Sequence, residues 1–160
     1  MMKGVRITIA ILCLSGLTDA WALAGRSRPS GETPILLEQL YEREANPKKR
    51  VEIAMDLMDM RLKLLGSAFQ DGQGQQQQVV QDYLKAVGLL EKAVSGASHT
   101  GTSKKAEVHL RRHIREMEML QISVSFYERE ALDEVLSRIT NLREEILYSI
   151  MNPPRESAKR

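Results

Sequence analysis

Two histidines, His109 and His113, lie four residues apart in a segment with helical periodicity. On a helix this spacing places both imidazoles on one face, where two ring nitrogens can reach the same metal ion. The residues between them include Arg111 and Arg112, and no glutamate stands there to serve as the base of a metalloprotease. A metal site needs three or four ligands, and neighbouring arginines repel a cation. We therefore expect both histidines to be structural or surface residues and no residue to be a metal ligand.

Methionines are a second possible source of ligands. A haem bound inside a helical bundle needs axial His or Met side chains that face each other in the core. Met55, Met58 and Met60 follow one another at helical spacing, but methionine at such positions usually fills irregular core space. We expect these residues to pack in the core, and we expect no cofactor.

The chain offers no set of residues for nucleophilic or acid–base catalysis. A serine beside a histidine occurs in Gly96-Ala97-Ser98-His99-Thr100, without the preceding strand that a nucleophile elbow requires. The run Gly101-Thr102-Ser103-Lys104 lacks the glycine spacing of a phosphate-binding loop. Acidic residues are spread along faces that look solvated. The sequence therefore predicts no catalytic residue and a protein that is not an enzyme.

A basic stripe suggests an anionic partner such as a phospholipid surface. It consists of Lys104, Lys105, Arg111, Arg112 and Arg115. Because Glu107, Glu116 and Glu118 are interleaved with it, a solvated helix face is the preferred interpretation. The whole chain has 23 Lys+Arg and 21 Asp+Glu, a net charge of +2, and only 4% aromatic residues. Neither a strong field nor stacking platforms indicate a nucleic acid as partner.

The first 24 residues have the features of a secretory signal peptide. Lys3 and Arg6 precede an apolar run, and Ala22-Leu23-Ala24 provides small residues at a cleavage site after Ala24, with Ala22 as the alternative last residue. A membrane span needs about 20 apolar residues, and polar residues from Ser15 to Asp19 interrupt this run. We expect a periplasmic or secreted protein with no stable membrane span after cleavage.

Cleavage would remove the single cysteine, Cys13, and the single tryptophan, Trp21. The mature chain would then have no disulfide and no thiolate ligand, so packing alone must hold its fold. We expect residues 25–33 to be a flexible lead-in, residues 34–152 a single all-helical domain, and residues 153–160 a charged tail.

Apolar periodicity of three and four residues predicts five helices and no sheet. The first helix is short: it begins with Thr33 as cap and Pro34 and reaches Asn46. The second begins with Asn46 as cap and Pro47, and the solvated first turn of the third is formed by Gln75–Gln78. Ser103 caps the fourth helix, and a capping box of Ser125 and Glu128 opens the fifth. Residues 95–103 are expected to be a mobile loop. The second helix has two apolar seams: the first is Val51, Met55, Met58, Leu62, Leu65 and Phe69, and the second is Ile53, Leu57, Met60 and Leu64. The seam of the third helix is Val80, Tyr83, Val87, Leu90 and Val94, and that of the fourth is Ala106, Leu110, Ile114, Met117, Leu120 and Val124. The seam of the fifth helix is Leu132, Val135, Ile139, Leu142 and Ile146.

The predicted fold is all-α, an antiparallel bundle of four long helices with a short N-terminal helix; a helical-repeat solenoid is disfavoured because the helix starts are unevenly spaced. The second helix has two apolar faces, and only the strip of Glu52, Asp56, Asp59 and Lys63 looks fully solvated. We expect Ile35, Leu36 and Leu40 to cover the second face, formed by Ile53, Leu57, Met60 and Leu64.

Three segments of the chain resemble a pattern of bacterial exported helical domains of unknown function. They are Asn46-Pro47-Lys48-Lys49-Arg50-Val51-Glu52-Ile53-Ala54, Met60-Arg61-Leu62 and Asp82-Tyr83-Leu84-Lys85-Ala86-Val87. The resemblance covers residues 46–95 and, more loosely, 109–147. It implies an extracytoplasmic helical hairpin or bundle, with no activity or catalytic residues to carry over. The chain also looks somewhat like small periplasmic helical chaperones but lacks their Leu-Thr-x-x-Gln signature.

Together these features predict an exported, non-enzymatic protein that binds another protein or envelope component through a helix face. If the short first helix does not cover the second face of the second helix, that face becomes a partner groove or a homodimer seam. The alternatives are a periplasmic holdase and a metal- or haem-binding bundle that uses His109 and His113.

Overall fold

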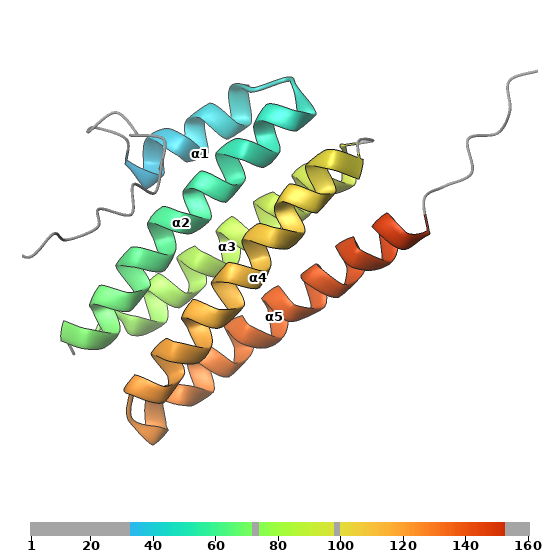
Figure 1. The fold of residues 1–160 in the computed structure, drawn as a ribbon. Helices are drawn as coiled ribbons and strands as arrows, with labels where there is room; N and C mark the ends of the chain where they lie inside the picture. Colours follow the sequence, from blue (N-terminus) through green and yellow to red (C-terminus); the bar gives the residue numbers. More distant parts are fainter. Residues whose placement is uncertain (1–32, 72–73, 98–99, 153–160) are drawn as a thin grey trace, which may run out of the picture. The chain divides into compact units, whose positions relative to one another are not determined.

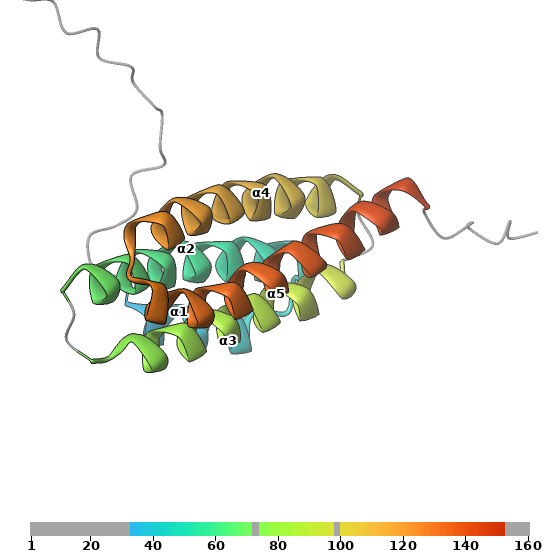
Figure 2. The same cartoon turned by 90° about the horizontal axis from the view of Figure 1, so that it is seen from below.

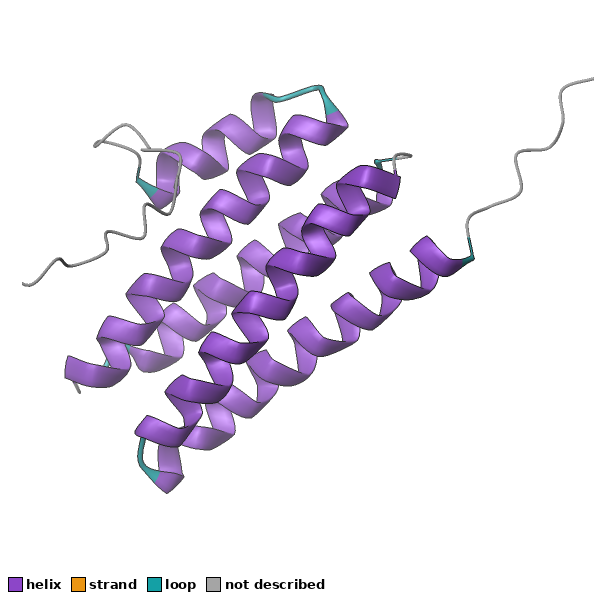
Figure 3. Ribbon diagram, in the orientation of Figure 1, coloured by secondary structure: helices purple, strands orange, loops and turns teal. Residues whose placement is uncertain are grey.

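The computed structural model describes residues 33–71, 74–97 and 100–152 of the 160-residue chain. Over these residues the protein is built from helices alone, as the periodicity predicted (Figures 1 and 3). The helices are α1 (Pro34–Arg43), α2 (Pro47–Asp71), α3 (Gln76–Ser95), α4 (Thr100–Ser123) and α5 (Phe126–Met151). The predicted signal peptide, the lead-in before Thr33 and the charged tail lie outside the described residues.

The helices form a bundle in which consecutive helices contact each other. α2 packs on α3 and α4 packs on α5, while contacts of α3 with α5 and of α2 with α4 join the two pairs. Figure 2, turned by 90° from Figure 1, shows α1 on the side of α2 and α3 that faces away from α4. α2, α3, α4 and α5 together enclose the core, and α1 lies outside these four helices.

Local signals at the helix starts explain most of the boundaries. Asn46 caps α2, since its Oδ1 accepts hydrogen bonds from the backbone N–H groups of Lys48 and Lys49 at 3.0 and 3.4 Å. Glu128 accepts from the backbone N–H and the hydroxyl of Ser125, at 3.1 and 2.6 Å, which confirms the capping box of α5. α4 differs from its prediction, because it begins at Thr100 rather than after a Ser103 cap.

The reason for this earlier start is burial. Thr102 and Ser103 lie in the first turn of α4 with their side chains buried against the bundle, so packing extends the helix into a segment that composition alone marked as loop. The prediction of a mobile loop over residues 95–103 was therefore wrong for Ser95, which ends α3, and for residues 100–103. His99 lies outside the described residues.

One hydrophobic core joins the seams of α2 to α5. All five apolar residues of the predicted α3 seam and all five of the α5 seam are buried, as are most of the first α2 seam. Met58 is fully buried, and Met55 and Met60 pack against the core, which confirms the packing role expected for these methionines.

The position of α1 differs from expectation. α1 buries Leu37 and Tyr41, whereas Ile35, Leu36 and Leu40, which were expected to face α2, are exposed. The Tyr41 hydroxyl donates a 2.9 Å hydrogen bond to the carbonyl oxygen of Leu89 on α3. This contact turns α1 toward the groove between α2 and α3.

An ion-pair network fixes the same rotation. Glu38 on α1 accepts from Arg61 on α2 at 2.9 Å and from Lys85 on α3 at 3.1 Å, and Arg61 also binds Asp82 at 2.8 Å. The second face of α2 is consequently covered only in part: Leu57 is buried, and Leu64 is exposed.

Candidate functional site

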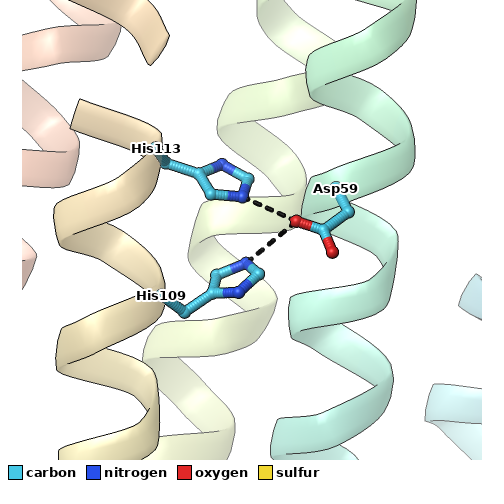
Figure 4. Close-up of side chains that lie close together, drawn as sticks. All are labelled: Asp59, His109 and His113. Carbon is cyan, nitrogen blue, oxygen red and sulfur yellow. Dashed lines mark hydrogen bonds and ion pairs between the residues drawn. The ribbon is translucent and has the colours of Figure 1, made fainter. Parts of the chain in front are cut away.

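A polar cluster lies inside the bundle where α2, α3 and α4 meet. His109 and His113, on one face of α4, point toward the carboxylate of Asp59 on α2, as Figure 4 shows. The Nε2 atom of His113 lies 2.8 Å from Asp59 Oδ1, and the Nε2 atom of His109 lies 3.5 Å from the same oxygen. The ring centroids of the two histidines are 4.3 Å apart. The structure thus joins the two histidines that the sequence singled out to a third group from another helix.

Tyr83 on α3 completes the inner side of this cluster. Its hydroxyl oxygen lies 2.7 Å from Nδ1 of His113, whose side chain is 0% exposed. Both contacts are satisfied together when Nε2–H of His113 donates to Asp59 and the Tyr83 hydroxyl donates to Nδ1. Asp59, His113 and Tyr83 therefore form one continuous hydrogen-bonded chain across three helices.

A guanidinium group closes the outer side. Nη2 of Arg112 donates to Asp59 Oδ1 and lies 3.5 Å from Nδ1 of His109 and 3.5 Å from Nε2 of His113. The Arg112 side chain is half exposed, and its Nε lies 3.6 Å from Glu116 on the same helix. One positive group thus contacts all three members of the Asp59, His109 and His113 set.

Burial and charge act in opposite directions on Asp59. Burial alone would raise the pKa of its carboxyl, but the hydrogen bond from His113 and the positive charges around it hold that pKa far below its ordinary value. Burial, together with the nearby Asp59 carboxylate, raises the pKa of the Tyr83 hydroxyl well above its ordinary value. At neutral pH the cluster therefore contains an ionised carboxylate and a protonated phenol.

The sequence did not identify Asp59 as part of this cluster. It placed Asp59 with Glu52 and Asp56 on a fully solvated strip of α2, but all three are half-buried because α4 packs over that strip. Lys105 of α4 lies 3.8 Å from Glu52 in the same contact. The prediction of a solvated strip was therefore wrong except at Lys63.

A signal for the burial of His113 was present in the sequence. The buried positions of α4 include Ala106, Leu110, His113 and Met117, at steps of four, three and four residues. The predicted seam used Ile114 in place of His113, and Ile114 is only half-buried. A histidine at a seam position indicates a polar group that needs partners inside the core.

The basic stripe of α4 is largely engaged in ion pairs. Glu107, itself buried, accepts from Arg111 at 2.8 Å and from Arg143 of α5 at 2.8 Å. Hydrogen bonds from these arginines overcome the effect of burial and lower the pKa of the Glu107 carboxyl. Two arginines are thus held by one carboxylate.

A second feature lies at the turn between α4 and α5, where four large apolar side chains are exposed. Met119, Ile122, Phe126 and Tyr127 are 68%, 74%, 78% and 90% exposed, and we call this set the apolar end. The rings of Phe126 and Tyr127 contact each other edge to face. A hollow of about 660 Å³ is lined by Ile122, Phe126 and Tyr127 together with Gln121, Arg129, Glu130 and Asp133.

Among the described helices, none combines the length and the apolar character needed to cross a membrane. No protein-family model, no curated protein and no solved structure matches this chain.

Proposed function

We propose that this chain is an exported, non-enzymatic helical protein that binds another protein through the apolar end. The observation that carries the proposal is the gathering of four exposed apolar side chains, two of them aromatic, around one turn. Contiguous exposed apolar surface is a usual mark of a binding site, and aromatic residues and methionine are enriched in protein interfaces.

The charges around the apolar end indicate the chemistry of the partner. Between residues 115 and 134 the chain has two basic residues and six acidic ones, a local charge of 2 − 6 = −4, whereas the whole chain has a charge of +2. The acidic residues are Glu116, Glu118, Glu128, Glu130, Asp133 and Glu134. An apolar partner segment with basic flanks matches this surface, and an anionic membrane is repelled by it.

A basic amphipathic helix is the partner segment that we propose. Such a helix can place its apolar face in the hollow between Ile122, Phe126 and Tyr127, while its lysines or arginines reach Glu130 and Asp133 at the rim. The interface would then have an apolar centre and a charged edge, as protein interfaces commonly do.

Export and the finer fold belong to the same proposal. Lys3, Arg6 and the Ala22-Leu23-Ala24 sequence support a cleaved signal peptide, and the contacts between consecutive helices support an antiparallel bundle of four long helices. Mass spectrometry of protein expressed in a bacterium tests the first point. A mature chain that begins at Gly25 is expected, and one that begins at Met1 would contradict export.

Fluorescence anisotropy tests the partner chemistry. The probe is a labelled amphipathic helical peptide made of leucine and lysine, and the comparison peptide replaces every lysine with glutamate. We expect the lysine peptide to bind and the glutamate peptide to bind at least about tenfold more weakly. The double variant Phe126→Ser/Tyr127→Ser should lose at least about tenfold in affinity for the lysine peptide, because it removes the aromatic anchors.

The matched control is Tyr148→Ser/Met151→Ser, which removes two other exposed apolar residues from the opposite end of α5. This control should bind as the unchanged protein does. Equal binding of both peptides, or equal loss in both double variants, would overturn the proposal. A homodimer in light scattering that Phe126→Ser/Tyr127→Ser dissolves would also overturn it, because a second copy would then occupy the surface.

A further inference from the structure

We infer that Asp59, His109 and His113 form a binding site for a divalent transition metal ion of the zinc class. This site is independent of the apolar end and uses none of its residues. The inference reverses our sequence-based expectation that the histidine pair lacks a third ligand, because α2 supplies that ligand from 50 residues earlier in the chain.

The spacing of the three donors suits one ion. A carboxylate oxygen of Asp59 and one ring nitrogen from each histidine all lie within 4.8 Å of one another. Zinc binds nitrogen and oxygen at about 2.0–2.2 Å, so neighbouring ligands of a tetrahedral site are about 3.3 Å apart. The separation of 3.5 Å between His109 Nε2 and Asp59 Oδ1 is close to this value, and the 2.8 Å contact of His113 needs to open by about half an ångström.

The donor types favour a transition metal over magnesium or calcium. Two imidazole nitrogens and one carboxylate oxygen are a typical set for zinc, whereas magnesium and calcium prefer oxygen ligands alone. Asp59 and His109 are only partly buried, with 21% and 11% of their side chains exposed, and the half-exposed Arg112 covers the donor atoms on the outer side, so movement of Arg112 would open the site to solvent. A water molecule can complete the coordination from that side.

Tyr83 is placed to orient one of the ligands. Metal-bound histidines usually donate their second ring N–H to a fixed acceptor, and the Tyr83 hydroxyl lies 2.7 Å from Nδ1 of His113. When a metal occupies Nε2, the proton moves to Nδ1 and the Tyr83 oxygen accepts from it. Metal binding therefore changes the tautomer of His113 from Nε2–H to Nδ1–H.

Arg112 holds the place of the cation in the metal-free protein. Its Nη2 contacts Asp59 Oδ1 and approaches both histidines to 3.5 Å, so one positive group faces all three donors. Because its side chain is half exposed and Glu116 lies within 3.6 Å of its Nε, the guanidinium can leave the cluster without losing every partner. Arg112 and the metal then compete for the same carboxylate.

Calorimetric titration of the full purified chain with zinc chloride tests the site, with magnesium chloride as the comparison. We expect one zinc per chain with a dissociation constant of about 1 μM or tighter, and no heat from magnesium. His109→Ala and Asp59→Asn should each weaken zinc binding at least about tenfold. Of the two histidines, His109 is the one to replace, because it is less buried than His113 and its loss leaves the Asp59–His113–Tyr83 hydrogen-bonded chain in place.

Arg112→Gln should change the affinity for zinc in the opposite direction. Removal of the competing charge should tighten zinc binding several-fold, whereas Arg115→Gln, an exposed arginine on the same helix, should leave it unchanged. Nitrogen-15 NMR of His113 should show Nε2–H in the metal-free protein and Nδ1–H with zinc bound. The inference is overturned if zinc gives no heat, if His109→Ala and Asp59→Asn bind zinc as tightly as the unchanged protein, or if zinc leaves the His113 tautomer unaltered.

Discussion

Asp59 and His113 are 54 residues apart in the chain and 2.8 Å apart in the fold, where the Oδ1 atom of one meets the Nε2 atom of the other. This contact connects α2 to α4, two helices that are not consecutive. Through Tyr83 the same hydrogen-bonded chain reaches α3. It is therefore both the centre of the candidate metal site and a polar connection across the core.

Loss of the His113 ring should destabilise the protein strongly. His113→Leu keeps the volume approximately but leaves the Asp59 carboxylate and the buried Tyr83 hydroxyl without their shared partner. We expect the free energy of unfolding in urea to fall by about 2 kcal/mol, because the buried Tyr83 hydroxyl loses its partner while Asp59 keeps its contact with Arg112. Tyr83→Phe should cost about 1 kcal/mol alone and much less in the His113→Leu background. Additive losses would show that the two residues are not coupled.

The sequence predicted well which residues share one face of a helix, and less well which of the other helices that face contacts. The α5 seam from Leu132 to Ile146 is buried throughout, because a period of three and four residues defines one face whatever that face contacts. Asp59 lies on a polar strip of α2 that α4 covers. Because this contact depends on how helices distant in the sequence pack together, the periodicity of residues within α2 cannot predict it. The rotation of α1 likewise depends on where Tyr41 and Glu38 find partners on α2 and α3.

The attachment of α1 should depend on pH through Glu38. Burial raises the pKa of this carboxyl, but hydrogen bonds from Arg61 and Lys85 outweigh burial and lower it below the ordinary value of 4.5. Because the folded state has the lower pKa, the contribution of Glu38 to stability is present above about pH 4.5 and is lost as the pH falls through the folded-state value.

Glu38→Gln tests this dependence. The variant should lower the free energy of unfolding by about 1 kcal/mol at pH 7 and by much less at pH 3, where the native carboxyl is itself protonated. Glu42→Gln, an exposed change on the same helix, serves as the control and should have little effect at either pH. A deficit of equal size at both pH values would show that the ion pairs with Arg61 and Lys85 do not stabilise α1.

Glu107 should contribute more to stability than any exposed carboxylate of α4. Glu107→Gln removes a buried charge that holds Arg111 and Arg143 and joins α4 to α5, so we expect a loss of about 2 kcal/mol in urea unfolding. Glu116→Gln, whose pairing with Arg112 is half exposed, should change stability by less than about 0.5 kcal/mol. Equal effects of the two substitutions would contradict the assignment of Glu107 as the connection between α4 and α5.

Glycine substitutions should separate backbone entropy from packing. Gly88 lies inside α3, and a Cβ atom built there meets no atom within 4 Å. Gly88→Ala should therefore raise the free energy of unfolding by about 0.5–1 kcal/mol, because alanine loses less conformational freedom in a helix than glycine does.

Substitution of Gly74 is the matched comparison, and we expect it to lower stability where Gly88→Ala raises it. Gly74 precedes α3 with a φ of 70°, in the left-handed region, and a Cβ atom would again meet nothing within 4 Å. Gly74→Ala should lower stability by about 1 kcal/mol through backbone strain alone. Thermal unfolding of both variants measures the pair of effects. A stabilising Gly74→Ala would mean that this turn does not hold its left-handed conformation in solution, and a destabilising Gly88→Ala would mean that α3 packs more tightly around that position than the fold shows.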